Sequence, residues 1–235
     1  KIMVLGAVKK PGTYNISSLA TLFNALYVSG GPTENGSFRN IELVRNNKVL
    51  LVADLYDFLI NSNQKNNIRL MDNDIIKIPY AKVQVSIAGE VNREGIYELQ
   101  PKENLNKLIE YAGGYQSNAF KARITGLRNT DFDRQVLDII KDSINTFIPQ
   151  NGDSYNVGSI INKFQNRLII EGAVFKPGNY ALTTGLTVQE LLHKAEGLRE
   201  DAYTGRAVLV RTKDDLTKEI ISINLLSDSG KNFIL

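Results

Sequence analysis

Three arginines are placed where their side chains could bind an anion. Arg45, Arg128 and Arg211 stand at equal intervals, and each follows a short run of apolar residues. A guanidinium group is a planar fork of donors that matches carboxylates and other anions. The three arginines could therefore line a groove for an acidic glycan. We favour the alternative, in which each arginine lies over its own sheet and pairs with a nearby acid.

Three tyrosines recur at the same interval, namely Tyr14, Tyr97 and Tyr180. Aromatic rings at these positions could stack on sugar rings. A repeated tyrosine more often packs at the edge of a core and donates its hydroxyl hydrogen to the backbone. We favour this structural role, so the ligand-binding residues remain unknown at this stage.

The acidic run "DND" at 72–74 could hold a cation between Asp72 and Asp74. The equivalent run at 151–153 is "NGD", which keeps the chemistry of a turn without the paired acids. We therefore interpret both runs as turns. His193 is the only histidine, and it lacks the partners that a catalytic triad or a metal site needs.

The remaining composition excludes several kinds of enzyme. There is no cysteine, so disulfides, thiolate metal sites and a cysteine nucleophile are excluded. The sequence has no phosphate-binding loop, no zinc-protease motif and no GxGxxG fingerprint. We predict that the chain is not an enzyme and that it has no catalytic, cofactor-binding or metal-binding residues.

The charge pattern does not indicate nucleic-acid binding. The net charge is only +3, and no block of five like charges occurs. No apolar run approaches the roughly 18 residues of a membrane-spanning helix.

These residues recur because the chain contains an internal repeat. The motif "GAVKKPGTY" at 6–14 returns as "GEVNREGIY" at 89–97 and "GAVFKPGNY" at 172–180, 83 residues apart each time. This interval exceeds the roughly 20–50 residues of a solenoid unit and suits a small domain. We predict three tandem domains, at 1–81, 82–166 and 167–235.

Each repeat has the same predicted elements. An alternating strand is followed by a turn and by a return strand. We predict a type II turn, in which Gly12, Gly95 or Gly178 supplies the positive φ that the third turn position needs. A helix with one apolar stripe follows, capped by Thr21, Asn104 or Thr187. Two further strands, a small helix and a last strand complete the unit. The order predicts an α+β fold resembling a β-grasp.

The ends and junctions carry further expectations. The chain starts within a strand pattern, so we expect a piece of a longer protein. The third repeat stops at "NFIL", so we expect it to be truncated or disordered at its C-terminus. The junctions "YAK" at 80–82 and "INKFQNR" at 161–167 are not rich in glycine or serine. We therefore expect the repeats to be closely coupled.

The repeats resemble the SLBB (soluble-ligand-binding β-grasp) domain. The resemblance rests on "GAVKKPGTY", on helices that end in "AGG" at 112–114, on "DLYDFL" at 54–59 and on "DNDIIKIP" at 72–79. It covers two repeats and part of the third. Two positions depart from the pattern: Glu94 replaces the turn proline, and Glu196 replaces the first glycine of the pair.

Tandem SLBB domains are typical of outer-membrane polysaccharide export proteins of the Wza type. The resemblance implies a protein of the outer membrane that faces the periplasm. It implies a homo-oligomeric ring around a conduit for capsular or extracellular polysaccharide, and an inner-membrane polysaccharide co-polymerase as a further partner. The domains would act in assembly and in lining the conduit, without covalent chemistry.

Other functions of the family remain as alternatives. The chain could be a binding module for a glycan or another soluble ligand. A DNA-uptake (competence) protein is less favoured, because the helix-hairpin-helix repeats of such proteins are missing here. A respiratory-complex subunit would need cysteines for its iron–sulfur ligands, and this sequence has none.

Overall fold

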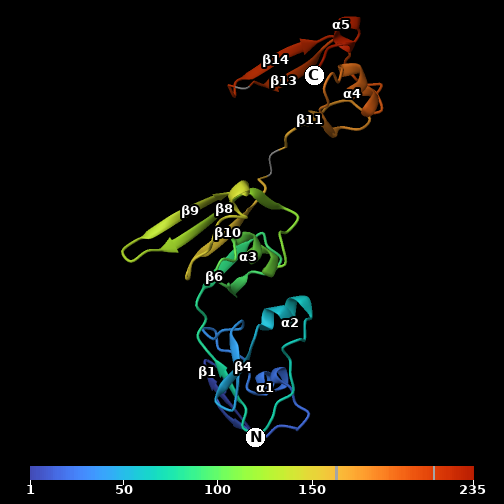
Figure 1. Cartoon of the computed structure of the whole chain (residues 1–235). Helices are drawn as coiled ribbons and strands as arrows, with labels where there is room; N and C mark the ends of the chain where they lie inside the picture. The colour runs from blue at the N-terminus through green and yellow to red at the C-terminus, as the bar shows by residue number, and fades with distance from the viewer. Residues whose placement is uncertain (162–163, 214) are drawn as a thin grey trace. The chain divides into compact units, whose positions relative to one another are not determined.

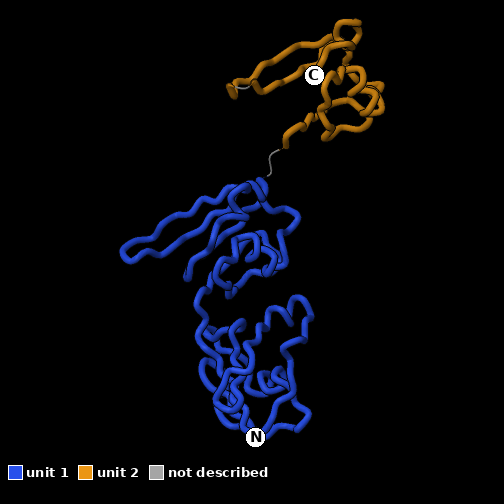
Figure 2. The backbone as a smooth tube through the Cα atoms, in the orientation of Figure 1, with its two compact units in different colours: residues 1–161 blue, residues 162–235 orange. Residues whose placement is uncertain are grey.

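The computed structural model describes residues 1–161, 164–213 and 215–235. The chain divides into two compact units, residues 1–161 and residues 162–235 (Figure 2). The first unit contains the first two repeats of the sequence. The second unit contains the third.

The first repeat is a five-stranded mixed sheet in the order β2-β1-β5-β3-β4. Figure 1 labels β1, β4, α1 and α2 of this repeat. The central strand β5 runs parallel to β1 and antiparallel to β3. Its elements are β1 (Ile2–Gly6), β2 (Gly12–Tyr14), α1 (Leu22–Val28), β3 (Ile41–Arg45), β4 (Lys48–Ala53), α2 (Leu55–Asn61) and β5 (Ile75–Ile78).

The second repeat has the same topology, in the order β7-β6-β10-β8-β9. Here β10 is the central strand, parallel to β6 and antiparallel to β8. Its elements are β6 (Gln84–Gly89), β7 (Gly95–Glu98), α3 (Leu105–Tyr111), β8 (Ala119–Asn129), β9 (Arg134–Ile140), the 3₁₀ helix η1 (Lys141–Ser143) and β10 (Ser154–Ser159).

The second unit has two separate two-stranded sheets, β11-β12 and β13-β14. Within the described residues, no strand joins these two hairpins as β5 and β10 join the hairpins of the first two repeats. The elements are β11 (Arg167–Ile170), β12 (Gly178–Ala181), α4 (Val188–Lys194), β13 (Ala207–Thr212), β14 (Lys218–Ile223) and α5 (Asp228–Lys231).

The cores are built from alternate side chains of the strands and from one stripe of apolar side chains on each helix. In β1, Ile2 and Val4 are buried, whereas Met3 and Leu5 are exposed. The buried residues pack with Leu22 of α1 and with other apolar residues of the helix and sheet. The second repeat repeats this arrangement around α3. The mixed sheets, each packed with a helix, confirm the predicted α+β fold class.

The predicted helix caps are confirmed. Thr21, Asn104 and Thr187 are the N-cap residues of α1, α3 and α4. Thr187 and Glu190 form the predicted capping box, in which each side chain satisfies a backbone N–H of the first turn.

The repeated turn differs in detail from its prediction. Gly12, Gly95 and Gly178 all have positive φ angles, as expected, but the values are 152°, 157° and 143°. A type II turn needs a φ near 80° at this glycine. The glycine requirement is therefore confirmed, and the predicted turn type is wrong. Each glycine instead opens the return strand of its hairpin.

Coupling between repeats is confirmed at the first junction, because the first two repeats form one compact unit. At the second junction, residues 162 and 163 lie outside the described part, so close coupling there stays a prediction. The described residues include no helix long and apolar enough to cross a membrane.

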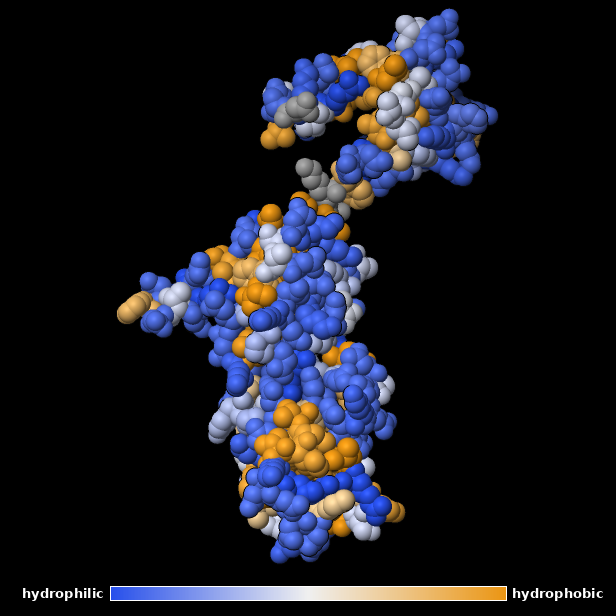
Figure 3. Space-filling view, in the orientation of Figure 1, coloured by the Kyte–Doolittle hydropathy of each residue, from blue (hydrophilic) through white to orange (hydrophobic). Residues whose placement is uncertain are grey.

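Apolar side chains are also exposed on the first repeat, and Figure 3 shows an apolar patch on its surface. Among its exposed apolar residues are Val49, Leu50 and Val52, which all belong to the edge strand β4. Large contiguous apolar patches are typical of surfaces that contact other molecules.

Candidate functional site: a polar cluster between the first two repeats

Two of the three repeated arginines pair with an acid of their own repeat. Arg45 donates from Nε and Nη2 to the Asp74 carboxylate, at 2.8 and 2.7 Å. Arg128 does the same to Asp153, at 2.9 and 2.7 Å. In both repeats the arginine lies near the end of the third strand, and the aspartate lies immediately before the central strand. Each pair therefore ties two neighbouring strands together.

Both aspartates are buried, with side-chain exposures of 0%. Burial alone would raise the pKa of Asp74, but hydrogen bonds from Arg45 and from the Met71 N–H outweigh it and lower the pKa. The pKa of Asp153 is lowered in the same way against its burial, by Arg128, the Gln150 N–H and the Tyr155 hydroxyl. Both carboxylates are therefore charged at neutral pH.

Arg211 has a different environment. Its Nη2 donates to the Ile234 carbonyl at 3.3 Å, and the side chain pairs with no carboxylate among the described residues. The predicted pairing with a local acid is thus found in the first two repeats and not in the described part of the third.

The three tyrosines have the predicted structural role. Their hydroxyls donate to the carbonyls of Lys10, Arg93 and Lys176, each four residues earlier. The distances are 2.5, 2.8 and 2.6 Å for Tyr14, Tyr97 and Tyr180. Each bond closes the turn that contains the repeated glycine.

The structure does not bring the other candidates together. Asp72 is exposed, whereas Asp74 is buried and paired with Arg45. His193 lies on an exposed part of α4. Among residues 1–161, 164–213 and 215–235, no group of three or more histidines and acids could hold a metal ion.

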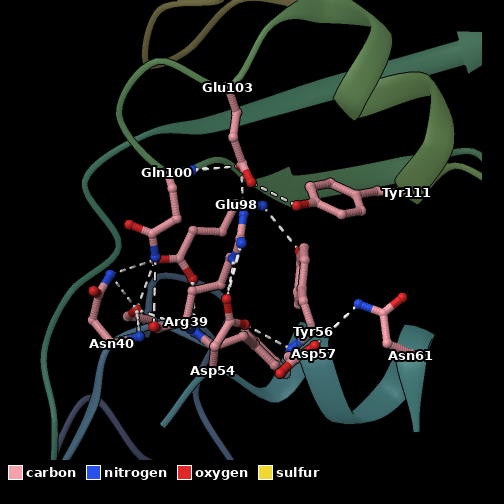
Figure 4. Close-up of polar contacts among 12 residues, drawn as sticks. Arg39, Asn40, Asp54, Tyr56, Asp57, Asn61, Glu98, Gln100, Glu103 and Tyr111 are labelled. Atoms are coloured by element: carbon pink, nitrogen blue, oxygen red, sulfur yellow. Dashed lines mark hydrogen bonds and ion pairs between the residues drawn. The ribbon is translucent and has the colours of Figure 1, made fainter. Parts of the chain in front are cut away.

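A cluster of charged and aromatic residues joins the first repeat to the second (Figure 4). We call it the junction cluster, and its members are Arg39, Asp54, Tyr56, Glu98, Glu103 and Tyr111. The first three come from the first repeat: from the segment before β3, from the N-cap of α2 and from α2 itself. The other three come from the second repeat: from β7, from α3 and from the loop between them. The cluster therefore contains side chains from both sides of the "YAK" junction.

Arg39 lies at the centre of the junction cluster. Its Nε and Nη2 donate to Asp54 at 2.9 Å, and its Nη1 donates to Glu103 at 2.5 Å. The guanidinium also lies 5.1 Å from the ring centroid of Tyr56 and 5.2 Å from that of Tyr111. Ring faces attract a cation at such distances. With its side chain only 8% exposed, Arg39 holds groups of both repeats at once.

Glu98 makes a second set of contacts across the junction. Its carboxylate accepts from the Ser37 hydroxyl at 2.6 Å and from the Phe38 N–H at 2.7 Å. In return, the Glu98 N–H donates to the Tyr56 hydroxyl at 3.0 Å. Glu98 is 3% exposed, so these donors take the place of water around its carboxylate.

Electrostatics in the junction cluster favour the charged forms of Arg39 and Glu103. Burial works against the Arg39 charge, but hydrogen bonds to Asp54 and Glu103 raise its pKa. Burial would raise the pKa of Glu103, yet bonds from Arg39 and Tyr111 lower it. The Tyr111 hydroxyl donates to Glu103 at 2.6 Å, and burial together with this bond raises the pKa of Tyr111.

The arrangement of the junction cluster is suited to holding the two repeats together rather than to catalysing a reaction. In the described part of the chain, every buried side-chain nitrogen or oxygen has a hydrogen-bond partner. The cluster's charged groups are therefore occupied with one another. A satisfied buried network of this kind rigidifies a structure and fixes one geometry.

Sequence reasoning missed the junction cluster because its members do not recur. The repeat register places Ala122 and Gly205 at the position of Arg39, and Ile139 and Ser222 at the position of Tyr56. A usable signal was nevertheless present. Charged and aromatic residues that occur in one repeat only are candidates for contacts between repeats.

Comparison with known proteins supports the repeat assignment. The model of the SLBB domain matches residues 1–53, 84–128 and 169–219, which together make up more than half of the chain. Two curated proteins named "Polysialic acid transport protein KpsD", both from Escherichia coli, are each 26% identical over 195 residues. The match covers 83% of this chain and 34% of each relative, so the chain spans about a third of their length. The chain belongs to the SLBB domain family.

Proposed function

We propose that this chain is the non-catalytic, periplasmic part of an outer-membrane protein that exports capsular or extracellular polysaccharide. Three SLBB domains, at residues 1–81, 82–166 and 167–235, serve assembly and line the conduit. The full protein forms a homo-oligomer and works with an inner-membrane polysaccharide co-polymerase.

The observation that carries this proposal is the similarity to the polysialic acid transport protein, which extends over 83% of the chain. The three SLBB matches lie in tandem, as the sequence repeat requires.

The geometry of the first unit agrees with an assembly role. Its arginines, buried aspartates and repeated tyrosines hold strands and turns together, and the junction cluster holds two repeats in one compact unit. Rigid domains are suited to building the wall of a conduit. The exposed apolar side chains of β4 give the first repeat a surface for contacts with other molecules.

Deletion of the gene in its host tests the proposal. Surface polysaccharide and polysaccharide retained inside the cell are measured separately, with and without a plasmid copy of the gene. We expect the deletion strain to synthesise polymer and retain it, and the plasmid to restore surface polymer. Unchanged surface polymer would contradict the proposal, as would loss of polymer from both fractions, because that result indicates a role in synthesis.

A further inference from the structure

The sheet of the first repeat has an apolar surface on the side that points away from α1. Ile2 and Val4 of β1 pack in the core, so Met3 and Leu5 point to the opposite side, where they are 38% and 39% exposed. The same alternation in β3, β4 and β5 places further side chains on this side. We call it the outer face, and its members are Met3, Leu5, Glu42, Val44, Val49, Val52, Ile75 and Lys77.

The strand register arranges the members of the outer face in two rows. Residues that lie opposite one another in neighbouring strands share one face of the sheet. The first row is wholly apolar and crosses four strands as Met3, Ile75, Val44 and Val49. The second row lies beside it and consists of Leu5, Lys77, Glu42 and Val52. In the middle of the second row, Lys77 donates to the Glu42 carboxylate at 3.1 Å.

The fold does not require these side chains. The second repeat has the same strand order, yet Ser86 and Ser154 hold the first two positions of the row that is wholly apolar in the first repeat. Asn156 and Thr125 stand where the first repeat has its ion pair. Both repeats nevertheless bury a core of the same kind. The outer face of the first repeat is therefore available for contact with another molecule.

The charges of the outer face indicate which molecule fits it. Its members include one cation and one anion, Lys77 and Glu42, at paired positions of the adjacent strands β5 and β3. A two-fold axis that runs parallel to the strands, between β5 and β3, would place a second copy of the face on the first. Each Lys77 would then lie over Glu42 of the other copy. The face is thus complementary in charge to itself, as a two-fold symmetric contact requires.

The same axis brings apolar side chains onto apolar side chains. Ile75 of one copy would lie over Val44 of the other, because β5 and β3 exchange places across the axis. The positions further out would pair in the same way, Met3 with Val49 and Leu5 with Val52. Sheets that pack face to face keep their strand directions within about 30° of each other. An axis parallel to the strands produces this aligned packing.

We infer that two copies of the chain associate through the outer face of the first repeat, sheet against sheet, about this two-fold axis. The contact buries only one face of a small domain, so we expect a weak dimer whose population depends on protein concentration. The inference specifies one interface of the homo-oligomer, and in that respect it rests on the proposed function. Association of the purified chain tests the contact, whereas gene deletion tests export, so either can fail without the other.

Sedimentation equilibrium of the full 235-residue chain measures this association. We expect a monomer–dimer equilibrium that Val49→Asp weakens by a factor of about ten or more, because the substitution buries an unpaired charge against the apolar row. Val136→Asp is the matched control, since Val136 pairs with Leu127 in the second repeat as Val49 pairs with Val44 in the first. Val136→Asp should leave the equilibrium unchanged, and so should Ile220→Asp on β14, where Ile220 is 69% exposed.

An exchange of charges tests the position of the axis. Lys77→Glu gives the outer face two anions and Glu42→Lys gives it two cations, so each variant alone should dimerise more weakly than wild type by a factor of about ten or more. Mixed in equal amounts, the two variants should form a heterodimer at least about ten-fold tighter than either homodimer, because opposite charges then meet at both positions. Circular dichroism checks that both variants are folded. A loss of stability in either variant cannot produce the gain on mixing.

Three results would overturn the inference. One is a folded chain that stays monomeric up to the highest concentration at which it is soluble. Another is an association that Val49→Asp does not weaken, or that Val136→Asp or Ile220→Asp weakens equally, because a different surface would then make the contact. The third is a mixture of the Lys77→Glu and Glu42→Lys variants that associates no more tightly than its components, which would exclude the proposed axis.

Discussion

Replacing Arg39 with alanine should weaken the junction between the first two repeats. The change removes the cation that pairs with Asp54 and Glu103 and lies between two tyrosine rings. The two carboxylates would remain close together without their shared partner. Both repeats should stay folded, because Arg39 belongs to neither apolar core.

The size of the effect follows from burial. Breaking a buried ion pair by removing one partner costs about 3–5 kcal/mol. Asp54 and Glu103 keep side-chain exposures of 27% and 19%, so water can compensate in part, and we take the lower end of about 3 kcal/mol. For a unit of this size, 1 kcal/mol shifts the melting temperature by roughly 2–4 °C. We therefore expect Tm of the first unit to fall by about 6–12 °C.

Scanning calorimetry and hydrogen exchange can measure this change. The wild-type first unit should unfold in one transition, and the Arg39→Ala variant should unfold earlier or in two steps, with lost protection at the junction. Arg123→Ala is the matched control, because its pair with Asp138 is more than half exposed on both sides and should contribute at most about 1 kcal/mol. Equal effects of the two substitutions would contradict this prediction.

Three further predictions concern individual repeats. The folded pKa of Asp153 is depressed, so the stability that this carboxylate contributes is present above the usual aspartate pKa near 3.9 and is lost as pH falls through the folded pKa. Asp153→Asn should therefore lose less stability than wild type between pH 7 and pH 3, as measured by urea unfolding. Equal losses in the two proteins would contradict this prediction. Tyr97→Phe should cost about 1 kcal/mol in the same assay, because the bond to the Arg93 carbonyl is lost; a variant as stable as wild type would argue against the structural role. Gly89→Ala should destabilise the second repeat by about 1–3 kcal/mol more than Gly172→Ala destabilises the third, since only the first substitution places a Cβ against a carbonyl oxygen. Similar losses would show that the positive φ alone determines the cost of both substitutions.

The repeat made much of the fold predictable from sequence. Turn glycines, helix caps and apolar stripes recur at one spacing, so three weak local signals support each element. The strand order was not predictable, because pairing between distant strands leaves no local pattern. Likewise, a local acid was expected for each arginine, but Asp74 and Asp153 are 29 and 25 residues away from their partners.

The junction cluster was beyond this kind of prediction for a physical reason. The residues that recur in every repeat are those that each domain needs for its own core. Contacts between domains need residues that differ from one repeat to the next, such as Arg39 and Glu98. Departures from the repeat register are therefore the positions to search for contacts between repeats in a tandem protein.

The most direct test of the account links the junction cluster to export. In the deletion strain, the ratio of surface to retained polysaccharide is measured after rescue with wild-type, Arg39→Ala or Arg123→Ala genes, at matched protein levels. We expect full rescue by wild type and Arg123→Ala, and a lower surface fraction with Arg39→Ala. Full rescue by an Arg39→Ala protein whose first unit is measurably destabilised would contradict the claim that export depends on repeats held together at this junction.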